Sequence, residues 1–356
     1  MRRSRAPRLS LAVPGKILVV RTARWIPAAL ILAATPVWPA DCAGIGERGR
    51  SLLQQKQPEQ AAAEFRRALA GCPEQRILLL ELARALTAER KFTEAVDAAR
   101  EFLGVQPGSE AGLLVLANTH FMALEFPRCL EVVERLLTAN PRHRAALTMK
   151  ANAQYLGGDE AAAEQTFLAL IELDPNSEES NYSLGRIYYQ QNRFQPALAR
   201  FQRVLQLNPL SFKAYDNLGL CHEALSQDDQ AIRHYLKALE LVHKDHRDYD
   251  WAYGNLANLM LKRGEDEKAF QLAAEAADRN PASARNFFLG GKALGRLDKL
   301  DLAIKWLRQS AELDPGYAEP RYLLGQMYQR LGRKAEAEQE LKTFEEIQAR
   351  QPRRRR

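Results

Sequence analysis

The chain has 356 residues, of which 46% are hydrophobic and 27% are charged, and its formal net charge is +7. Residues 1–41 hold seven basic residues and one acid, and the last four residues are all arginine, so the rest of the chain carries a net charge of −3. A nucleic-acid-binding protein concentrates positive charge on its folded body, and this distribution therefore argues against that class.

The first 40 residues are typical of an export signal. An arginine-bearing segment ends at Arg24, and an uncharged apolar stretch follows from Trp25 to Ala40. This stretch is shorter than the roughly 20 residues of a membrane helix, and prolines interrupt it. We therefore expect residues 1–40 to be a cleaved signal peptide, which would make the protein exported, periplasmic or envelope-associated. The alternatives are an uncleaved leader that anchors the protein in a membrane, and a cytoplasmic protein.

From residue 42 onward, two residue types recur with one period. Prolines stand 34 residues apart, and after one longer interval the spacing resumes, at Pro73, Pro107, Pro141, Pro175, Pro209, Pro281 and Pro315. A second series keeps the same spacing with small residues, at Ala61, Ala95, Cys129, Ala163, Ala197, Ala231, Ala269, Ala303 and Ala337. Such a period indicates an array of repeats rather than a set of unrelated domains.

Counting from the prolines divides the array 42–351 into nine repeats. Their bounds are 42–75, 76–109, 110–143, 144–177, 178–211, 212–249, 250–283, 284–317 and 318–351. The sixth repeat has four extra residues, which fall in the charged segment 243–250. The basic residues of 352–356 are expected to form a disordered tail.

The fifth repeat has the clearest motif. It reads Asn181-x-x-Leu184-Gly185-x-x-Tyr188, then Ala197-x-x-x-Phe201, then Pro209. This pattern resembles the tetratricopeptide repeat (TPR), a pair of helices of this length. The resemblance covers residues 42–351 and implies an all-α fold, a right-handed superhelical solenoid of antiparallel helix pairs.

The motif residues have a packing role in this reading. The small residue at the eighth position of a repeat lets its two helices approach closely, and the alanine of the second helix does the same for the neighbouring repeat. Phe65, Phe167, Phe201 and Tyr235 are expected to fill the core. Each proline should end the second helix of its repeat.

The four cysteines bear on the compartment. Cys42 begins the first helix of the first repeat and Cys72 ends its second, so antiparallel packing would bring them together. A Cys42–Cys72 disulfide would suit an oxidising compartment, and two unrelated thiols are the alternative. Cys129 and Cys221 are expected to be small buried residues.

The resemblance implies that the first helices line a concave groove that binds a protein or peptide partner. We expect an extended segment to lie along repeats three to seven, because asparagine amides can bond a peptide backbone and aromatic rings add apolar contact area. The candidate groove residues, expected to be exposed, are Asn118, Phe121, Asn152, Tyr155, Tyr182, Arg186, Tyr189, Asn217, Asn255 and Asn258. The alternative is that the asparagines bond neighbouring helices and the tyrosines are ordinary surface.

No motif for catalysis is present in the sequence: it has neither a glycine-rich phosphate loop, a nucleophile elbow nor a paired zinc motif. We therefore expect a non-catalytic scaffold or adaptor for protein–protein interaction, without a cofactor. Two other functions are left open. One is a membrane-anchored assembly factor, and the other is a metal-binding activity of the histidines and carboxylates in 243–250, which are more simply read as a solvated linker.

Overall fold

The structure is a computed structural model that describes residues 40–72, 74–246 and 248–350, with the side chains of 40–45 and 243–245 left aside. The predicted leader, apart from Ala40, and the predicted basic tail lie outside the described residues. Within the described ranges the chain forms 18 α-helices and no strand, so the predicted all-α class is confirmed. None of these helices is both long and apolar enough to cross a membrane.

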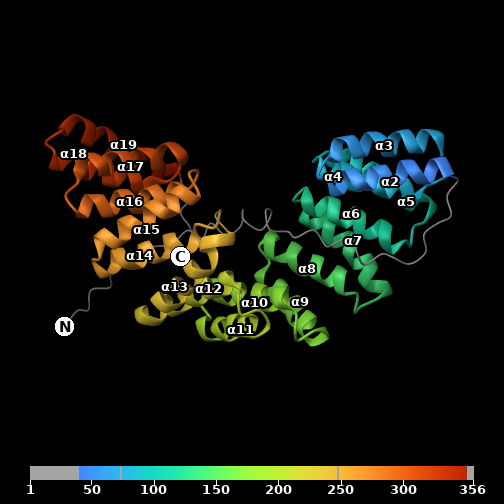
Figure 1. The fold of residues 1–356 in the computed structure, drawn as a ribbon, viewed down its shortest axis with the longest axis horizontal. Coiled ribbons are helices and arrows are strands. Elements are labelled where there is room, and N and C mark those ends of the chain that lie inside the picture. The colour runs from blue at the N-terminus through green and yellow to red at the C-terminus, as the bar shows by residue number, and fades with distance from the viewer. Residues whose placement is uncertain (1–39, 73, 247, 351–356) are drawn as a thin grey trace. The chain divides into compact units, whose positions relative to one another are not determined.

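The chain forms two compact units, which meet in the sequence between Pro175 and Asn176, inside the fourth predicted repeat. They are called here the N-terminal half and the C-terminal half, and each is described by itself. The N-terminal half contains α2(Ala40–Gln54), α3(Pro58–Gly71), α4(Ile77–Ala88), α5(Phe92–Val105), α6(Glu110–Met122), α7(Phe126–Ala139), α8(Arg144–Gly157) and α9(Glu160–Leu173) (Figure 1).

The C-terminal half continues the same alternation of helices (Figure 1). It contains α10(Glu178–Gln190), α11(Phe194–Leu207), α12(Phe212–Ala224), α13(Asp228–Asp245), α14(Trp251–Arg263), α15(Asp266–Arg279), α16(Ala284–Arg296), α17(Leu300–Leu313), α18(Ala318–Arg330) and α19(Lys334–Arg350). The even-numbered helices are the first helices of the repeats and the odd-numbered helices are the second.

Within each half, every helix packs against the next one along the chain. Each first helix also contacts the next first helix of its half. The series is α2, α4, α6 and α8 in the N-terminal half, and α10, α12, α14, α16 and α18 in the C-terminal half. They therefore form one layer in each half. We call its outward surface the first-helix face.

The core of each helix pair depends on the small residue of the first helix. A Cβ atom added at Gly185 would lie 2.8 Å from the Phe201 ring, and one at Gly219 would lie 2.4 Å from the Tyr235 ring. These two rings are fully buried. The predicted close approach at the eighth position is therefore a contact between its glycine and the large residue of the second helix.

The alanine series is buried along its whole length. Eight of its nine members, including Cys129, have no exposed surface, and the ninth, Ala337, is 2% exposed. Cys221 is also fully buried, as expected. Burial raises the pKa of the Cys129 and Cys221 thiols to about 12, so both stay protonated and act as packing residues.

Each of the seven prolines of the series stands directly after the residue that caps a second helix. In α7, for example, the backbone N–H of the cap residue Asn140 donates to the Leu136 carbonyl, and Pro141 follows. A proline has no N–H to continue this pattern and disfavours helical backbone in the residue before it. The predicted helix stops are therefore confirmed at the described prolines, and Pro73 lies outside the described residues.

The four extra residues of the sixth repeat lengthen a helix. Seven of the second helices, α3 through α17 apart from α13, have 14 residues each, whereas α13 has 18 and runs to Asp245. The expectation of a solvated linker over 243–250 is wrong for this part of the segment. One added turn of helix absorbs the insertion, since four residues are close to the 3.6 of a helical turn.

The turn inside each repeat places one residue in the left-handed region. These residues recur with the repeat period, at Lys56, Arg90, Leu124, Gly158, Asn192, Ser226, Gly264, Asp298 and Gly332. In the third repeat, Leu124 N–H donates to the Phe121 carbonyl and Glu125 N–H donates to the His120 carbonyl, the two hydrogen bonds that close a helix end of this type. Glycine adopts this backbone without strain, and a leucine does not.

Replacing Leu124 by glycine should therefore stabilise the protein. Leu124 has a φ of 62° and its side chain is 55% exposed, so the change removes backbone strain and little packing. We expect the free energy of unfolding to rise by about 1 kcal/mol, measured by urea denaturation. Gly264→Ala, at a φ of 76°, is the matched control and should lower the free energy of unfolding. A lower stability for Leu124→Gly would contradict the strain argument.

Candidate functional site

The ten candidate groove residues all lie on first helices. Asn118 and Phe121 are on α6, and Asn152 and Tyr155 are on α8, in the N-terminal half. The other six are on helices of the C-terminal half: Tyr182, Arg186 and Tyr189 on α10, Asn217 on α12, and Asn255 and Asn258 on α14. Since the two halves are separate bodies, each set is treated as a surface of its own half.

Four of these residues occupy the same position of their repeats and reach solvent. Asn118 is exposed, and Asn152, Arg186 and Asn258 are partly exposed. They stand at the ninth position of repeats three, four, five and seven, one residue after the small residue that contacts the second helix. Their side chains carry hydrogen-bonding groups, so they form a regular polar series on the first-helix face.

Three of the candidates expected to be exposed are buried. Tyr155 and Asn217 are each 9% exposed, and Asn255 is 5% exposed. Asn217 Nδ2 donates to the Lys213 carbonyl at 2.8 Å and to Tyr182 Oη at 3.2 Å, which ties α12 to α10. The alternative role of the asparagines, hydrogen bonding between helices, therefore describes Asn217, and Asn255 has a similar role.

The candidate aromatic residues pack on the second helix of their own repeats. The Phe121 ring meets Phe126 of α7 edge-on with centroids 5.9 Å apart. Tyr182 meets Phe201 at 5.8 Å, and Tyr189 meets Phe194 at 5.6 Å. Each ring is partly buried, so only its outer edge is available to a partner.

A buried carboxylate that the sequence analysis did not single out lies beneath this face in the C-terminal half. Asp216 of α12 is 3% exposed. It accepts hydrogen bonds from Tyr249 Oη at 2.7 Å and from Asn255 Nδ2 at 2.9 Å. Asn255 Oδ1 in turn accepts a hydrogen bond from the Arg285 guanidinium of α16 at 2.9 Å. These contacts connect three successive first helices, α12, α14 and α16.

The position of Arg285 depends on a glycine. A Cβ atom at residue 254 would lie 2.6 Å from Arg285 Nη1 and 3.0 Å from Asn286 Oδ1. Gly254 therefore leaves the space through which Arg285 reaches Asn255. Gly254 thus makes room for a polar contact between α14 and the next first helix, α16. Gly185 and Gly219, in contrast, make room for a ring of the second helix of their own repeat.

Burial raises the pKa of Asp216 to about 6, because the charged carboxylate loses its hydration. The hydrogen bonds from Tyr249 and Asn255 and the charge of Arg285 act in the opposite direction, and Asp250 adds to the rise. Asp216 therefore changes charge near neutral pH, where an ordinary aspartate is fully ionised.

Asp250 forms a second buried link between repeats. It is 5% exposed and accepts hydrogen bonds from Asn286 Nδ2 at 2.6 Å and from Asn280 Nδ2 at 3.3 Å. Asp250 precedes α14, Asn280 caps α15, and Asn286 lies on α16, so this carboxylate joins repeats seven and eight.

Three residues of 243–250, His246, Tyr249 and Asp250, have structural contacts. The His246 ring packs on Phe212 with centroids 4.4 Å apart, Tyr249 bonds Asp216, and Asp250 bonds two asparagines. His243 and Asp245, two of the residues in the metal hypothesis, have side chains outside the described residues. Among the described residues, no three histidine, cysteine or acidic side chains are grouped as a metal site would require.

Of the two cysteines in the predicted disulfide, the structure describes the side chain of Cys72 and not that of Cys42. Cys72 is 5% exposed and is disulfide-bonded. The side chain of Cys42 lies outside the described residues, so the Cys42–Cys72 pairing stays a prediction.

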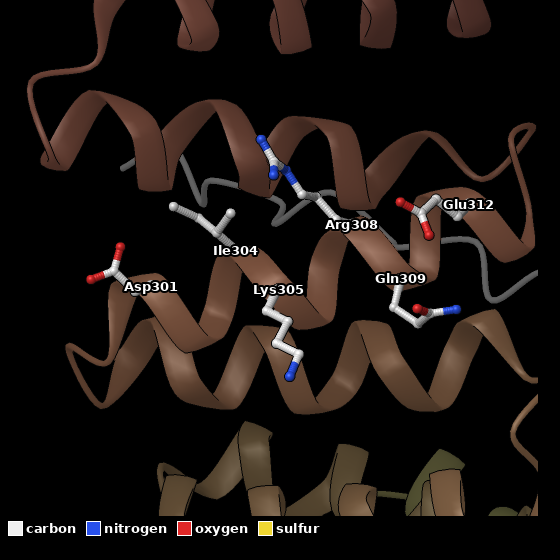
Figure 2. Close-up of a pocket in the computed structure, with 6 residues that line it drawn as sticks. All are labelled: Asp301, Ile304, Lys305, Arg308, Gln309 and Glu312. Atoms are coloured by element: carbon white, nitrogen blue, oxygen red, sulfur yellow. The ribbon is translucent and has the colours of Figure 1, made fainter.

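A shallow hollow of about 300 Å³ lies on the second helix α17. It is lined by Asp301, Ile304, Lys305, Arg308, Gln309 and Glu312 (Figure 2). Figure 2 shows that Lys305 and Arg308 point away from each other on this one helix. Acidic and basic side chains balance, and no aromatic residue lines the hollow. It offers little surface for specific binding.

Comparison with known proteins identifies the repeats. Sequence profiles described as tetratricopeptide repeats match residues 47–110, 114–178 and 288–352, residues 210–282, and residues 185–226. No curated protein matches the chain significantly.

Two solved structures show the similarity of fold. One is a tetratricopeptide repeat protein from Parabacteroides merdae, with a TM-score of 0.59 and 16% sequence identity. The alignment covers 71% of this chain and 99% of that protein. The APC/C hetero-tetramer Cut9–Hcn1 has a TM-score of 0.56 and 16% identity, with coverage of 81% and 57%.

The Asp216 contacts should make the stability of the C-terminal half depend on pH. Its folded pKa of about 6 lies above its ordinary value of 3.8, so the folded state retains a proton that the unfolded state releases. The stability gained from this proton is fully present below about pH 4 and is lost as the pH rises through about 6. Relative to Asp216→Asn, which does not titrate, the wild type should lose up to about 3 kcal/mol of unfolding free energy over this range.

Urea denaturation of the full chain at several pH values, followed by circular dichroism, measures this difference. Asp301→Asn removes an exposed carboxylate of α17 and is the control for the loss of one charge. A constant difference between the wild type and Asp216→Asn across this pH range would contradict the raised pKa.

Proposed function

Because the chain belongs to the tetratricopeptide repeat family, we propose that it is a non-catalytic scaffold that binds a segment of a partner protein on its first-helix face. TPR proteins are typically non-catalytic and typically bind proteins or peptides. One observation carries the proposal for this chain. Polar side chains at the ninth position recur on four first helices, α6, α8, α10 and α14, and reach solvent, whereas α12 between the last two has Leu220 at this position.

The structure suggests which residues a partner would touch. Asn118 and Asn152 lie on neighbouring first helices of the N-terminal half, and Arg186 and Asn258 lie on first helices of the C-terminal half. Asparagine and arginine side chains can bond the backbone of an extended segment, and the outer edges of Phe121, Tyr182 and Tyr189 add apolar contact. Asn217 and Asn255 would act indirectly, by holding the first helices together.

Affinity capture from the native host, with the wild type and variants as bait, tests the binding face. Substituting alanine for Asn118 and Asn152 together, or for Arg186 and Asn258 together, should weaken capture of a specific partner by about tenfold or more, because each pair removes several hydrogen bonds. Glu131→Ala with Gln271→Ala, at exposed positions of second helices, is the matched control. Equal loss in the control, or no loss in either pair, would argue against the first-helix face.

We also propose that the protein is exported and works in the cell envelope. The arginine-bearing leader with its uncharged stretch supports this, and so does the disulfide at Cys72, because disulfides persist in oxidising compartments. A membrane-anchored assembly factor with an uncleaved leader is the second candidate, since the stretch from Trp25 to Ala40 is mostly apolar and carries no charge. A cytoplasmic scaffold is the third.

The intact mass of the protein recovered from its host separates these three. Cleavage near Ala40, together with a mass that rises on reduction and alkylation as one disulfide requires, is expected for the exported protein. A full-length mass in the membrane fraction would favour the anchored factor. A full-length mass in the cytoplasmic fraction with all four cysteines alkylated without reduction would contradict export.

A further inference from the structure

One cation on the first-helix face of the C-terminal half has no ionic partner in the described part of the chain. Lys292 lies at the ninth position of α16 and is partly buried. Its Nζ lies 5.9 Å from the centre of the Phe288 ring, one helical turn earlier. Within residues 40–72, 74–246 and 248–350, no carboxylate comes within ion-pair distance of this ammonium group.

The two basic neighbours of Lys292 are engaged differently. Lys262 of α14 forms an ion pair with Glu223 of α12 at 2.5 Å. Arg296 of α16 forms an ion pair with Asp266 at 3.2 Å and donates a hydrogen bond to the Leu261 carbonyl. Both therefore use their charge to join adjacent repeats. Lys292 contributes no such link.

The surroundings of Lys292 disfavour its charge. Burial, followed by the charges of Arg296 and Lys262, lowers the pKa of Lys292, and only Asp266 acts in the opposite direction. Partial burial of an unpaired charge next to like charges costs stability. An apolar residue of the same length would fill this place at lower free energy, so the fold gives no reason for a lysine here. Binding sites often keep such costly groups for a ligand.

We propose that Lys292 is an anion-binding centre, which receives a glutamate or aspartate side chain of an extended partner segment while an apolar side chain of that segment packs on Phe288. The proposal rests on the scaffold function and specifies the chemistry of its partner. The body of the chain is slightly acidic, with a net charge of −3 between leader and tail, so the attraction is local to this site. Asn258, at the ninth position of repeat seven on the adjacent α14, is partly exposed and can bond the segment backbone.

A carboxylate fits the site better than a phosphate. Phosphate sites combine arginine forks with backbone N–H groups at a helix N-terminus. Lys292 lies inside α16, where the backbone N–H groups are bonded within the helix. A single ammonium group over an aromatic ring instead suits one acidic side chain beside an apolar one.

The probe for this proposal is a capped peptide built from repeated Glu-Gly-Leu units, compared with the same peptide carrying glutamine in place of glutamate. Glu and Leu two positions apart lie on one side of an extended chain. With the full chain, titration calorimetry should show binding of the glutamate peptide at least tenfold tighter than that of the glutamine peptide. Lys292→Met should abolish this preference, and Lys292→Arg should retain most of it.

Lys305→Met removes a lysine from the exposed hollow of α17 and is the matched control, which should keep the preference (Figure 2). Loss of folding does not explain the expected result, because Lys292→Met removes an unpaired charge and should raise the melting temperature. The preference for glutamate should also fall with added salt.

Equal binding of the two peptides, no binding of either, or an unchanged preference in Lys292→Met would overturn the proposal. These outcomes are separable from failure of the scaffold function. A partner captured from the host that depends on the ninth-position pairs but binds Lys292→Met normally would leave the scaffold standing and reject the anion site. A partner indifferent to all of these variants would reject both.

Discussion

The contact between a glycine on the first helix and a large side chain on the second determines how closely the helices of a repeat pack. At Gly219 the Tyr235 ring occupies the place that a Cβ atom would need, 2.4 Å away. The ring is fully buried as a result, and its hydroxyl still reaches Glu223 Oε2 at 2.9 Å. Because the pair packs this closely, the buried alanine of the second helix can meet the next repeat. Where alanine takes the place of this glycine, as at Ala117 and Ala151, it is also fully buried, so a small residue at the eighth position serves the stack along each half.

A repeat of this kind cannot bury its apolar surface alone, so its stability depends on its neighbours. The contacts between repeats are not uniform along the chain. Where α12, α14 and α16 meet, apolar packing is supplemented by the buried Asp216 and Asn255 and by the partly buried Arg285. Removing one member would leave the others buried without a partner, which costs more than the loss of an exposed pair. Repeats six to eight are therefore joined more specifically than apolar packing alone would require.

The added turn of α13 belongs to the same region. Tyr249 and Asp250 follow this longer helix and supply two of the buried polar contacts, to Asp216 and to Asn286. The segment that follows the insertion thus supplies a hydroxyl and a carboxylate to the buried contacts between these repeats. On the first-helix face, the ninth-position residues and Lys292 reach solvent at least in part, and this exposure supports a binding role for them.

The sequence by itself determined the period, the helix pairs and the core. Proline and alanine keep their spacing because backbone geometry and close packing repeat with every unit, and such local constraints are visible in a single chain. Asn118, Asn152, Arg186 and Asn258 were among the ten groove residues expected from the resemblance, and the structure gives them solvent exposure.

Only the tertiary structure decided which polar residues are buried. Asn217 and Asn258 were both expected to be exposed groove residues, yet Asn217 joins two helices and Asn258 reaches solvent. Asp216 and Arg285 are far apart along the chain, and no periodic pattern pairs them. In the sequence, nothing distinguishes Lys292 from the other lysines and arginines. Its lack of an ionic partner among the described residues becomes visible only when its neighbours are known. Burial and pairing of charges depend on contacts between repeats, and these are set by side chains that do not follow the repeat pattern.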